Sequence, residues 1–323
     1  MMQGFDPKFE DFPDYILGIT KEIWEERGIA TLHDYYGKDI VVRSPTSVVV
    51  GNQGVIGATM ATLAEFPDRQ LLGEDVIWSG NDQEGMLSSH RIVTTATHLG
   101  DGIYGKATGK TLKYRVIADC YAINNVITDE WLIRDQGAIV KQMGWDAKTF
   151  ALDQIEREGG AENCIKPFTP SIDKPGPYKG KGNDNIWGHK YAEIITAFMN
   201  ADMAAVEREY DRACNVVYPG GVEGISFAAV DRFWMGLRAS FPNAKLTIEH
   251  QIGREDPMMP PRAAIRFGLH GKHDGWGMFG QPSGKEVYIM GAAHAEFGPW
   301  GLRREYVLFD ETAIWKQIAL QTG

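Results

Sequence analysis

A histidine and an aspartate occupy strand-like segments from which they could form an acid/base pair. His98 ends the run "SSHRIVTTATH", and Asp119 lies in the run "TLKYRVIADCY". Side chains two residues apart point to the same face of a strand, so His98 shares a face with His90. Asp119 shares a face with Arg115 and Tyr121 by the same rule. On neighbouring strands that face one cavity, the imidazole and the carboxylate could remove a proton from a carbon next to a carbonyl group.

A structural interpretation of both residues remains open. His98 could end its strand and hydrogen-bond the following turn, and Asp119 could be a satisfied polar residue. The two interpretations of His98 are equally well supported. An aspartate among apolar strand positions is costly unless it is paired, which favours a functional role for Asp119.

The segment that joins these two runs, "THLGDGIYGKATGKTLKY", ends like a phosphate-binding loop. Gly109, Lys110 and Thr111 match the last three positions of that motif. The position that needs the first glycine of the motif is Tyr104, and the residues that follow predict a strand where the motif requires a helix. We therefore interpret the segment as the connection of a hairpin.

The chain repeats itself when it is shifted by 175 residues without a gap. The matches include Phe66-Pro67 with Phe241-Pro242, His98 with His273, Gly105 with Gly280, Gly109-Lys110 with Gly284-Lys285, Glu130 with Glu305, Asp135 with Asp310, Tyr35 with Tyr210, and Val41-Val42 with Val216-Val217. We infer a tandem duplication with one domain over residues 10–150 and a second over 185–323. The segment 151–184 between them is rich in Pro, Gly and Lys and is interpreted as a linker.

The second copy carries candidate groups of its own. His273 takes the position of His98, and His294 takes that of Asp119. The alternating strand puts two further polar side chains on the face of His294: Tyr288 and Glu296. Such a set suggests a metal site, but no HxH or HExxH spacing supports one, so we expect neither a metal nor a cofactor. The acid/base groups could lie in either copy.

Two pairs of carboxylates recur at equivalent positions. Glu130 and Glu305 each precede an aromatic residue in a predicted strand, and we interpret them as solvent-facing. Asp135 and Asp310 precede the last predicted helix of each copy, and we interpret them as N-caps. Neither pair is assigned to the site.

Each copy predicts the same order of elements. Residues 12–36 and 187–211 have apolar side chains at helical spacing. A short strand, a helix stopped by Pro67 or Pro242, four further strands and a short C-terminal segment follow. Helices followed by a meander of long strands predict an α+β fold in which a curved sheet wraps around helices.

The composition is that of a globular protein, with 323 residues of which 43% are hydrophobic. A net charge of −10 without a cluster of Lys and Arg excludes a nucleic-acid surface. The sequence contains neither an apolar run of about 18 residues nor a leader-like N-terminus, so we expect no membrane span and a cytoplasmic protein. Cys120, Cys164 and Cys214 show no CxxC or Cys/His spacing, so we expect neither a disulfide framework nor a zinc site.

The order of these motifs resembles the SnoaL-like polyketide cyclases of the nuclear transport factor 2 superfamily. The resemblance covers the first copy and, more weakly, the second. It rests on these residues of the first copy: Phe66, Pro67, Asp68, Thr97, His98, Gly100, Gly105, Thr108, Gly109, Lys110, Asp119, Trp131, Asp135, Gln142 and Gly144. It implies two tandem cone-shaped curved-sheet barrels of the cystatin-like type, each with helices on the concave side around an apolar cavity. It also implies functional His and Asp side chains at positions such as His98 and Asp119.

We therefore expect four catalytic residues: His98, Asp119, His273 and His294. The residues expected to bind the substrate are Tyr36, Trp78, His90, Arg115, Tyr121, Tyr288 and Glu296. These groups predict a cofactor-independent acid/base enzyme for a hydrophobic, oxygenated small molecule with an aromatic or polycyclic body. The reaction would form or break a C–C bond as in an aldol or retro-aldol step, or be a related elimination or isomerisation.

Two alternatives differ in class. The first is a non-catalytic small-molecule-binding or assembly protein whose tandem domains pair through their sheets as a pseudo-dimer, and such a chain could also form a homo-oligomer. The second is the activation of water by Asp119 with Arg115, as in an epoxide hydrolase. Fold analogy alone does not select among these functions.

Overall fold

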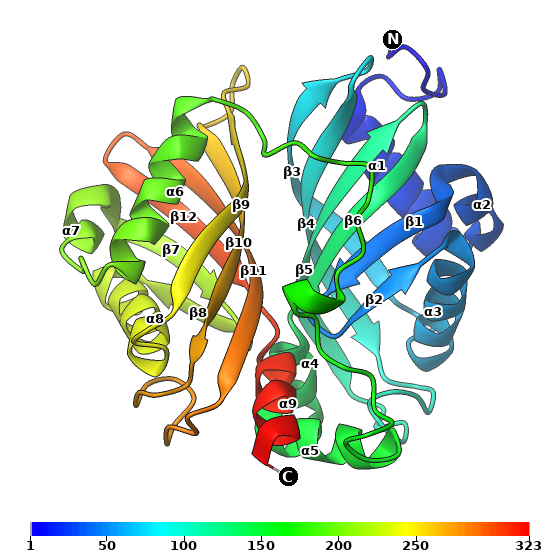
Figure 1. The fold of residues 1–323 in the computed structure, drawn as a ribbon. Coiled ribbons are helices and arrows are strands. Elements are labelled where there is room, and N and C mark those ends of the chain that lie inside the picture. The colour runs from blue at the N-terminus through cyan, green and yellow to red at the C-terminus, as the bar shows by residue number, and fades with distance from the viewer. Residues whose placement is uncertain (1, 323) are drawn as a thin grey trace.

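The computed structural model describes residues 2–322, which form two similar units in chain order (Figure 1). The first contains α1 (Phe12–Thr20), the π-helical turn η1 (Lys21–Glu25), the 3-10 turn η2 (Ile29–Thr31), α2 (Leu32–Tyr35), β1 (Tyr36–Ser44), β2 (Ser47–Val50), α3 (Asn52–Glu65), β3 (Gln70–Asn81), β4 (Gly85–Thr97), β5 (Thr111–Ile123), β6 (Val126–Arg134), α4 (Gln136–Met143) and α5 (Ala147–Arg157). After the 3-10 turn η3 (Pro170–Ile172), the second contains α6 (Ile186–Met199), α7 (Ala205–Glu209), β7 (Tyr210–Tyr218), β8 (Val222–Ile225), α8 (Ser226–Ser240), β9 (Lys245–Arg254), β10 (Arg262–Lys272), β11 (Glu286–Gly298), β12 (Gly301–Leu308) and α9 (Glu311–Thr322).

Each unit is built on one six-stranded sheet. The strand order is β2-β1-β6-β5-β4-β3 in the first sheet and β8-β7-β12-β11-β10-β9 in the second. Only β1 with β6 and β7 with β12 run parallel among the pairs of the described strands. The predicted α+β fold with two tandem curved sheets is confirmed.

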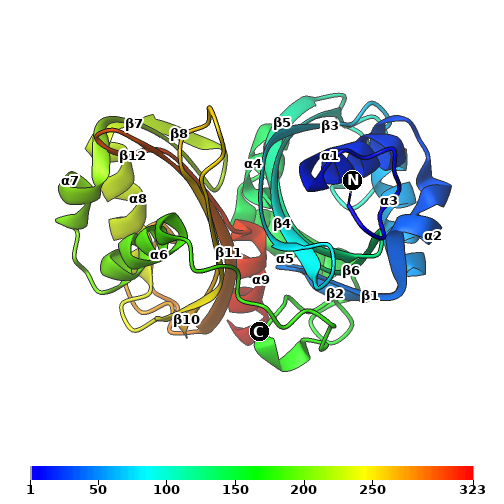
Figure 2. The same cartoon turned by 90° about the horizontal axis from the view of Figure 1, so that it is seen from above.

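The sheets curve around their helices, α1 and α3 in the first unit and α6 and α8 in the second (Figure 2). Helix α1 begins after Asp11, whose carboxylate accepts a hydrogen bond from the backbone N–H of Asp14. Its apolar residues Tyr15, Ile16 and Ile19 recur at helical spacing and are buried. Burial of this stripe fixes α1 on the concave side of the sheet.

The internal repeat holds in the structure, with a correction in its first strand. Val42 of β1 lies opposite Glu130 of β6, and Val216 of β7 lies opposite Glu305 of β12. The turn from β7 to β8 is one residue longer than the turn from β1 to β2, so the shift along the first strand is 174 residues and not 175. The corrected pairs are Tyr36 with Tyr210 and Val42 with Val216. Since a slip of one residue reverses the face of a side chain, this correction decides which tyrosines point inward.

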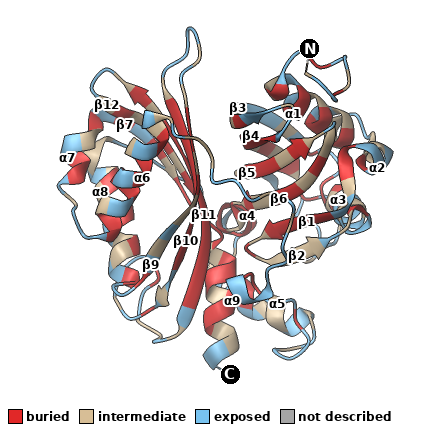
Figure 3. Cartoon of the chain, turned by 45° about the horizontal axis from the view of Figure 1, so that its top comes forward, coloured by how far each residue is buried: buried red, intermediate tan, exposed pale blue. Residues whose placement is uncertain are grey.

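The convex sides of the two sheets pack against each other (Figures 1 and 2). Ile117 and Ile133 of the first sheet contact Met290, Ala292 and Leu308 of the second. Strands β4, β10 and β11 are therefore buried over most of their length on both faces (Figure 3).

The segment between the two units is attached to both of them. Helix α5 extends to Arg157, so the predicted linker begins inside a helix. Further along, Asp173 forms an ion pair with Arg43 of β1. The hydroxyl group of Tyr178 is hydrogen-bonded to His250 of β9. The segment thus spans the junction of the two sheets as ordered structure.

Membrane-spanning helices, metal-binding clusters and cysteines were sought in residues 2–322. No helix in this range combines the length and apolarity that are needed to cross a bilayer. The range also holds no group of three His, Cys, Asp or Glu side chains arranged to bind a metal ion. The three cysteines are buried and free.

Candidate active site

The first unit contains a cavity of about 610 Å³ between its sheet, α1 and α3. Much of the wall is apolar and includes Ile16, Ile19, Val42, Val55, Leu71, Ile92, Val116, Ala118 and Leu132. Polar side chains line it in two places, one around Glu130 and one around Arg69 and Arg134. Such a cavity suits a small apolar molecule that carries a few polar groups.

Small side chains on α3 leave room for this cavity. Ala58 and Thr59 line it, and the equivalent residues of α8 are Phe233 and Trp234. Both large residues are buried in the core of the second unit, and Trp234 has no exposed surface. The second unit therefore fills with its own side chains the space that the first unit leaves open.

Glu130 projects from β6 into the cavity. Its neighbours across the inner face of the sheet are Cys120 of β5 and Val42 of β1. The side chain is only 6% exposed, and this burial raises the pKa of its carboxyl group to about 7. A hydrogen bond donated by the Tyr36 hydroxyl opposes the rise in pKa. A carboxyl group that titrates near neutral pH can both accept and donate a proton.

His90 reaches the same cavity from β4. Its ring has space because a glycine, Gly73, lies beside it: a Cβ atom there would come 3.0 Å from Nε2. This Nε2 is buried and has no hydrogen-bond partner among residues 2–322. Burial lowers the pKa of His90 to about 3, and the charge of Arg91 contributes. The imidazole is therefore neutral at pH 7 and has a free nitrogen for a ligand.

Strand β5 separates Glu130 from His90. Cys120 pairs with Glu130, and Ala118 pairs with His90. Two strand spacings and two residues along the strand put the Cα atoms of Glu130 and His90 roughly 12 Å apart. A ring system bound between them could present a C–H bond to the carboxylate and an oxygen atom to the imidazole.

Two of the residues expected to bind the substrate, Tyr36 and His90, line this cavity, whereas Glu130 was not among the expected site residues. The interpretation of Glu130 and Glu305 as solvent-facing is wrong, because both are buried. The recurrence of a carboxylate at one strand position in both copies was the available signal, since buried polar groups must be paired or functional. In the second unit the pairing is internal: Glu305 accepts hydrogen bonds from Tyr191, Tyr210 and Tyr218.

His98 lies outside the cavity and secures the turn that follows β4. Its Nδ1 accepts a hydrogen bond from Thr108, and its Nε2 donates one to Glu65 at 3.1 Å. Asp119 lies opposite Ser89, nine residues before His98 and on the other face of the sheet. At strand spacing this is about 30 Å. The predicted His98/Asp119 pair is therefore not formed.

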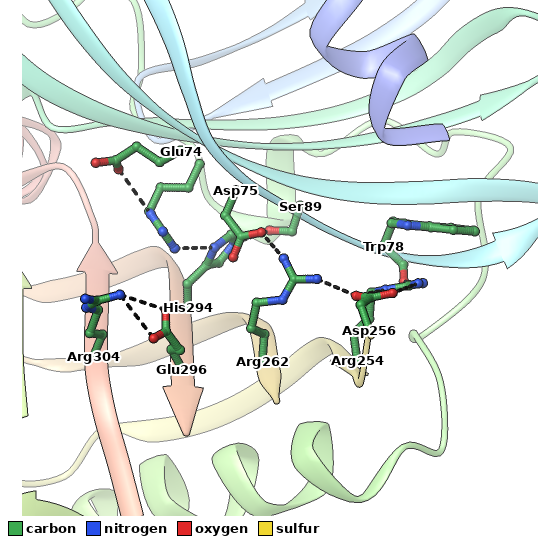
Figure 4. A network of polar contacts seen from close by, with 11 residues as sticks. Glu74, Asp75, Trp78, Ser89, Arg254, Asp256, Arg262, His294, Glu296 and Arg304 are labelled. Atoms are coloured by element: carbon green, nitrogen blue, oxygen red, sulfur yellow. Dashed lines mark hydrogen bonds and ion pairs between the residues drawn. The ribbon is translucent and has the colours of Figure 1, made fainter. Parts of the chain in front are cut away.

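Asp119 and His294 lie between the two sheets and not in a cavity. Asp119 forms an ion pair with Arg266, although burial raises the pKa of its carboxyl group. His294 is hydrogen-bonded to Arg91 through Nδ1 at 3.1 Å and to Ser89 through Nε2 at 2.8 Å (Figure 4). Because arginine only donates, Nδ1 accepts and Nε2 carries the proton. Both side chains are committed to the contact between the sheets.

Asp119 and His294 occupy equivalent positions in the two units, and each contacts an arginine of the other unit. The repeat relates Asp119 to His294 and Arg91 to Arg266. The aromatic partners of the arginines are also related, since Arg266 lies 3.8 Å from the ring centroid of Trp131 and Arg91 lies 3.8 Å from that of Tyr306. Reciprocity of this kind is the mark of a two-fold interface.

Arg115 is also on the outer face of the first sheet. It forms an ion pair with Glu74, whereas Asp119 is paired with Arg266. The water-activating pair of Asp119 with Arg115 is therefore not formed.

The other predicted residues have partners outside the cavity. In the second unit, His273 is hydrogen-bonded to Ser283 at 3.2 Å in the turn after β10, as His98 is to Thr108 in the first. The four remaining residues are distributed as follows: Trp78 lies against Arg254, Tyr121 donates to the carbonyl of Glu84, Tyr288 donates to Glu249, and Glu296 pairs with Arg304 (Figure 4). None of these residues lines the cavity of the first unit.

Comparison with known proteins yields structural neighbours only. No protein-family model matches the sequence, and no curated protein matches it. Similar solved structures include IdmH of Streptomyces antibioticus, named as a candidate polyketide cyclase, with 21% identity, a TM-score of 0.36, and coverage of 41% of this chain and 98% of its own. A candidate SnoaL-like polyketide cyclase of Jannaschia Sp. CCS1 has 12% identity, a TM-score of 0.36, and coverage of 42% and 96%. AclR of Streptomyces galilaeus, a candidate hydroxylase, has 18% identity, a TM-score of 0.34, and coverage of 40% and 78%.

Each of these neighbours covers about one of the two units. The resemblance to SnoaL-like polyketide cyclases is confirmed as a structural likeness.

Proposed function

We propose that the first unit is a cofactor-independent acid/base enzyme for a hydrophobic, oxygenated small molecule, with Glu130 as the proton-transferring group. The observation that carries the proposal is a buried carboxyl group whose pKa is raised to about 7 at the wall of an apolar cavity of about 610 Å³. General acid/base catalysis is most effective when the catalytic pKa lies near the working pH.

The reaction that fits these groups begins at a carbon next to a carbonyl group. Glu130 takes the proton, and the electron pair moves into an enolate. The neutral His90, with a proton on Nε2, donates a hydrogen bond to the enolate oxygen. Tyr36 keeps its proton, because burial raises the pKa of its hydroxyl group well above the usual value, and it orients the carboxylate. Aldol or retro-aldol steps, eliminations and isomerisations all pass through such an enolate.

For the second unit we propose a supporting role. Its core holds Trp234 and the three tyrosines around Glu305 where the first unit has its cavity. The reciprocal contacts across the sheets support an intramolecular pseudo-dimer, in which the second unit covers the convex face of the first. If the first unit also lacks turnover, the protein would be the non-catalytic small-molecule-binding protein given above as an alternative.

The test is the exchange of deuterium into the ketone 2-tetralone in D₂O, followed by mass spectrometry. We expect the wild-type chain to accelerate exchange next to the carbonyl group, and Glu130→Gln to lower the rate by at least about a hundredfold. The matched control is Glu305→Gln, the same change at the equivalent buried position. Binding of the ketone without exchange, or equal rates for wild type and Glu130→Gln, would refute the proposal.

A further inference from the structure

Two arginines line the cavity at a distance from Glu130. Arg69 directly precedes β3, and Arg134 is the last residue of β6. Four residues along β6 separate Arg134 from Glu130, which corresponds to roughly 13 Å. The apolar wall at Leu132 and Ala118 lies between these two polar places. The cavity is therefore polar at both ends and apolar in the middle.

Neither guanidinium group has an acidic partner. No ion pair within 4 Å is made by Arg69 or Arg134 in residues 2–322, and the Nε atom of each is buried without a hydrogen bond. Tyr114 lies beside Arg69, and Tyr104 lies beside Arg134. A phenol supplies an oxygen atom but no negative charge at neutral pH.

Arg69 is buried and Arg134 is partly buried. Two further buried arginines of the chain, Arg262 and Arg266, also have an Nε atom that lacks a hydrogen bond, but both have carboxylate partners. Arg262 forms ion pairs with Asp75 and Asp256, and Arg266 forms them with Asp119 and Glu249. A buried guanidinium without a carboxylate leaves a desolvation cost that a bound anion would offset.

Besides Glu130, three carboxyl groups line the cavity, those of Glu65, Asp101 and Asp310, and none of them forms an ion pair with these arginines. Asp101 accepts a hydrogen bond from the backbone N–H of Ala107. Glu65 accepts hydrogen bonds from His98 and from the backbone N–H groups of Ile103 and Tyr104. Asp310 uses one oxygen to cap α9, and burial raises the pKa of its carboxyl group to about 6. All three stay more than 4 Å from the guanidinium nitrogens, although the charge of Asp310 is among the smaller causes that raise the pKa of Arg134. Neither arginine is therefore held in a direct ion pair, and a bound anion could contact both.

We infer that Arg69 and Arg134 form a binding site for the carboxylate group of the substrate. The inference rests on the proposed function and narrows its substrate class to a molecule with an anionic end, an apolar body and a carbonyl group. Guanidinium groups match the geometry of a carboxylate and form charge-assisted hydrogen bonds with it. The carboxylate would lie at the arginines, the apolar body along Leu132, and the reacting carbon at Glu130.

The test compares the binding of 2-naphthylacetate with that of 2-naphthylacetamide, which has the same shape without the charge. In calorimetric or fluorescence titrations we expect the wild-type chain to bind the acid at least about tenfold more tightly than the amide. Arg69→Met and Arg134→Met should each remove this preference and leave the amide unaffected. The control is Arg232→Met, because Arg232 is exposed on α8 in the second unit.

Equal affinity of the wild-type chain for the acid and the amide would overturn the inference, and so would retention of the preference in both Met variants. If a Met variant does not fold, Arg69→Lys should keep part of the preference because it keeps the charge. Inorganic phosphate should not displace the acid, since it lacks the apolar body.

The two proposals fail separately. The preference for 2-naphthylacetate over 2-naphthylacetamide is measured in the wild-type chain and the arginine variants, so its outcome does not depend on whether the chain catalyses exchange. Loss of the acid preference would leave exchange into the uncharged 2-tetralone unaffected.

Discussion

Glu130 and Glu305 show how the surroundings of one side chain determine its chemistry. Both are buried glutamates at the equivalent position of the last strand. Glu305 accepts hydrogen bonds from three tyrosines, which hold its carboxylate in place. Glu130 receives one hydrogen bond, from Tyr36, and otherwise faces the cavity. Only Glu130 is therefore free to exchange a proton with a ligand.

The raised pKa of Glu130 predicts a pH-dependent effect on stability. In the unfolded chain the carboxyl group titrates at about 4.5, and in the folded chain at about 7. Between these values the folded state holds the proton more tightly, so the free energy of unfolding decreases as pH rises through this window. Relative to Glu130→Gln, the wild type should lose on the order of 3 kcal/mol between pH 4.5 and pH 7.5, measured by urea unfolding.

Glu156→Gln serves as the control for this measurement, because Glu156 is exposed on α5. It should show no comparable change across the window. A constant difference between the wild type and Glu130→Gln would mean that Glu130 titrates normally in the folded state, and the proposed base would lose its physical support.

At this scale the sequence predicts part of the site. Tyr36 and His90, both expected to bind the substrate, line the cavity. Tyr36 was a candidate as an aromatic side chain, and His90 because it shares a strand face with His98. Glu130 was misjudged because alternation along a strand does not say which face is buried. For a carboxylate in a strand, exposure is the common case.

At the scale of elements, the contrast between α3 and α8 explains why one unit has a cavity and the other does not. The two helices occupy equivalent places, but Ala58 and Thr59 stand where α8 has Phe233 and Trp234. Protein interiors are close-packed, so an open space of this size in the core indicates a binding site for a ligand.

Filling the cavity from α3 should therefore block ligand binding. Thr59→Trp introduces the residue that α8 has at this place, and we expect it to abolish the binding of 2-naphthylacetamide in a fluorescence titration. The control is Met60→Trp, because Met60 is the next residue and is exposed. If Thr59→Trp folds and binds the amide with wild-type affinity, the ligand does not occupy this cavity.

Alternation along a strand predicts which of its side chains share a face, but it does not predict how the strand pairs with its neighbour. Residues were grouped correctly within each strand, since Arg115, Ile117 and Asp119 do share one face. The register between β4 and β5 pairs His90 with Ala118, so the face of His90 is opposite to that of Asp119. Register depends on tertiary pairing and not on the periodicity of either strand. For this reason the sequence could not show that His98 and Asp119 lie on opposite faces of the sheet.

At the scale of the whole molecule, the two sheets are joined by charged contacts as well as apolar ones. Arg266 pairs with Asp119, and Arg91 contacts His294, its equivalent under the repeat. A buried ion pair contributes little net stability, but removing one partner leaves the other charge uncompensated. These residues therefore affect folding and the contact between units more than the chemistry of the cavity.

Asp119→Ala should destabilise the chain without impairing exchange into 2-tetralone. We expect a loss of roughly 2–4 kcal/mol in urea unfolding, because Arg266 remains buried without its main partner. The double variant Asp119→Ala/Arg266→Met should recover much of this loss. A folded Asp119→Ala chain that has lost exchange activity would return Asp119 to the catalytic residues and contradict the present assignment.

The sequence was most informative about the whole molecule. Its repeat and its order of elements predicted two tandem α+β units, because glycines, prolines and hydrophobic periodicity recur in both copies. The residues that form the contact between the units could not be identified from the sequence. A charged residue buried at an interface and one buried in an active site look the same in a strand, and only the position of its partner distinguishes them.

The pH profile of deuterium exchange into 2-tetralone is the sharpest test of Glu130 as the catalytic base, because it reports the proton transfer and the titrating group together. We predict a rate that rises with pH and levels off above about 7, as Glu130 loses its proton, and a low, pH-independent rate in Glu130→Gln. A profile that is the same in the wild type and in Glu130→Gln would contradict this role.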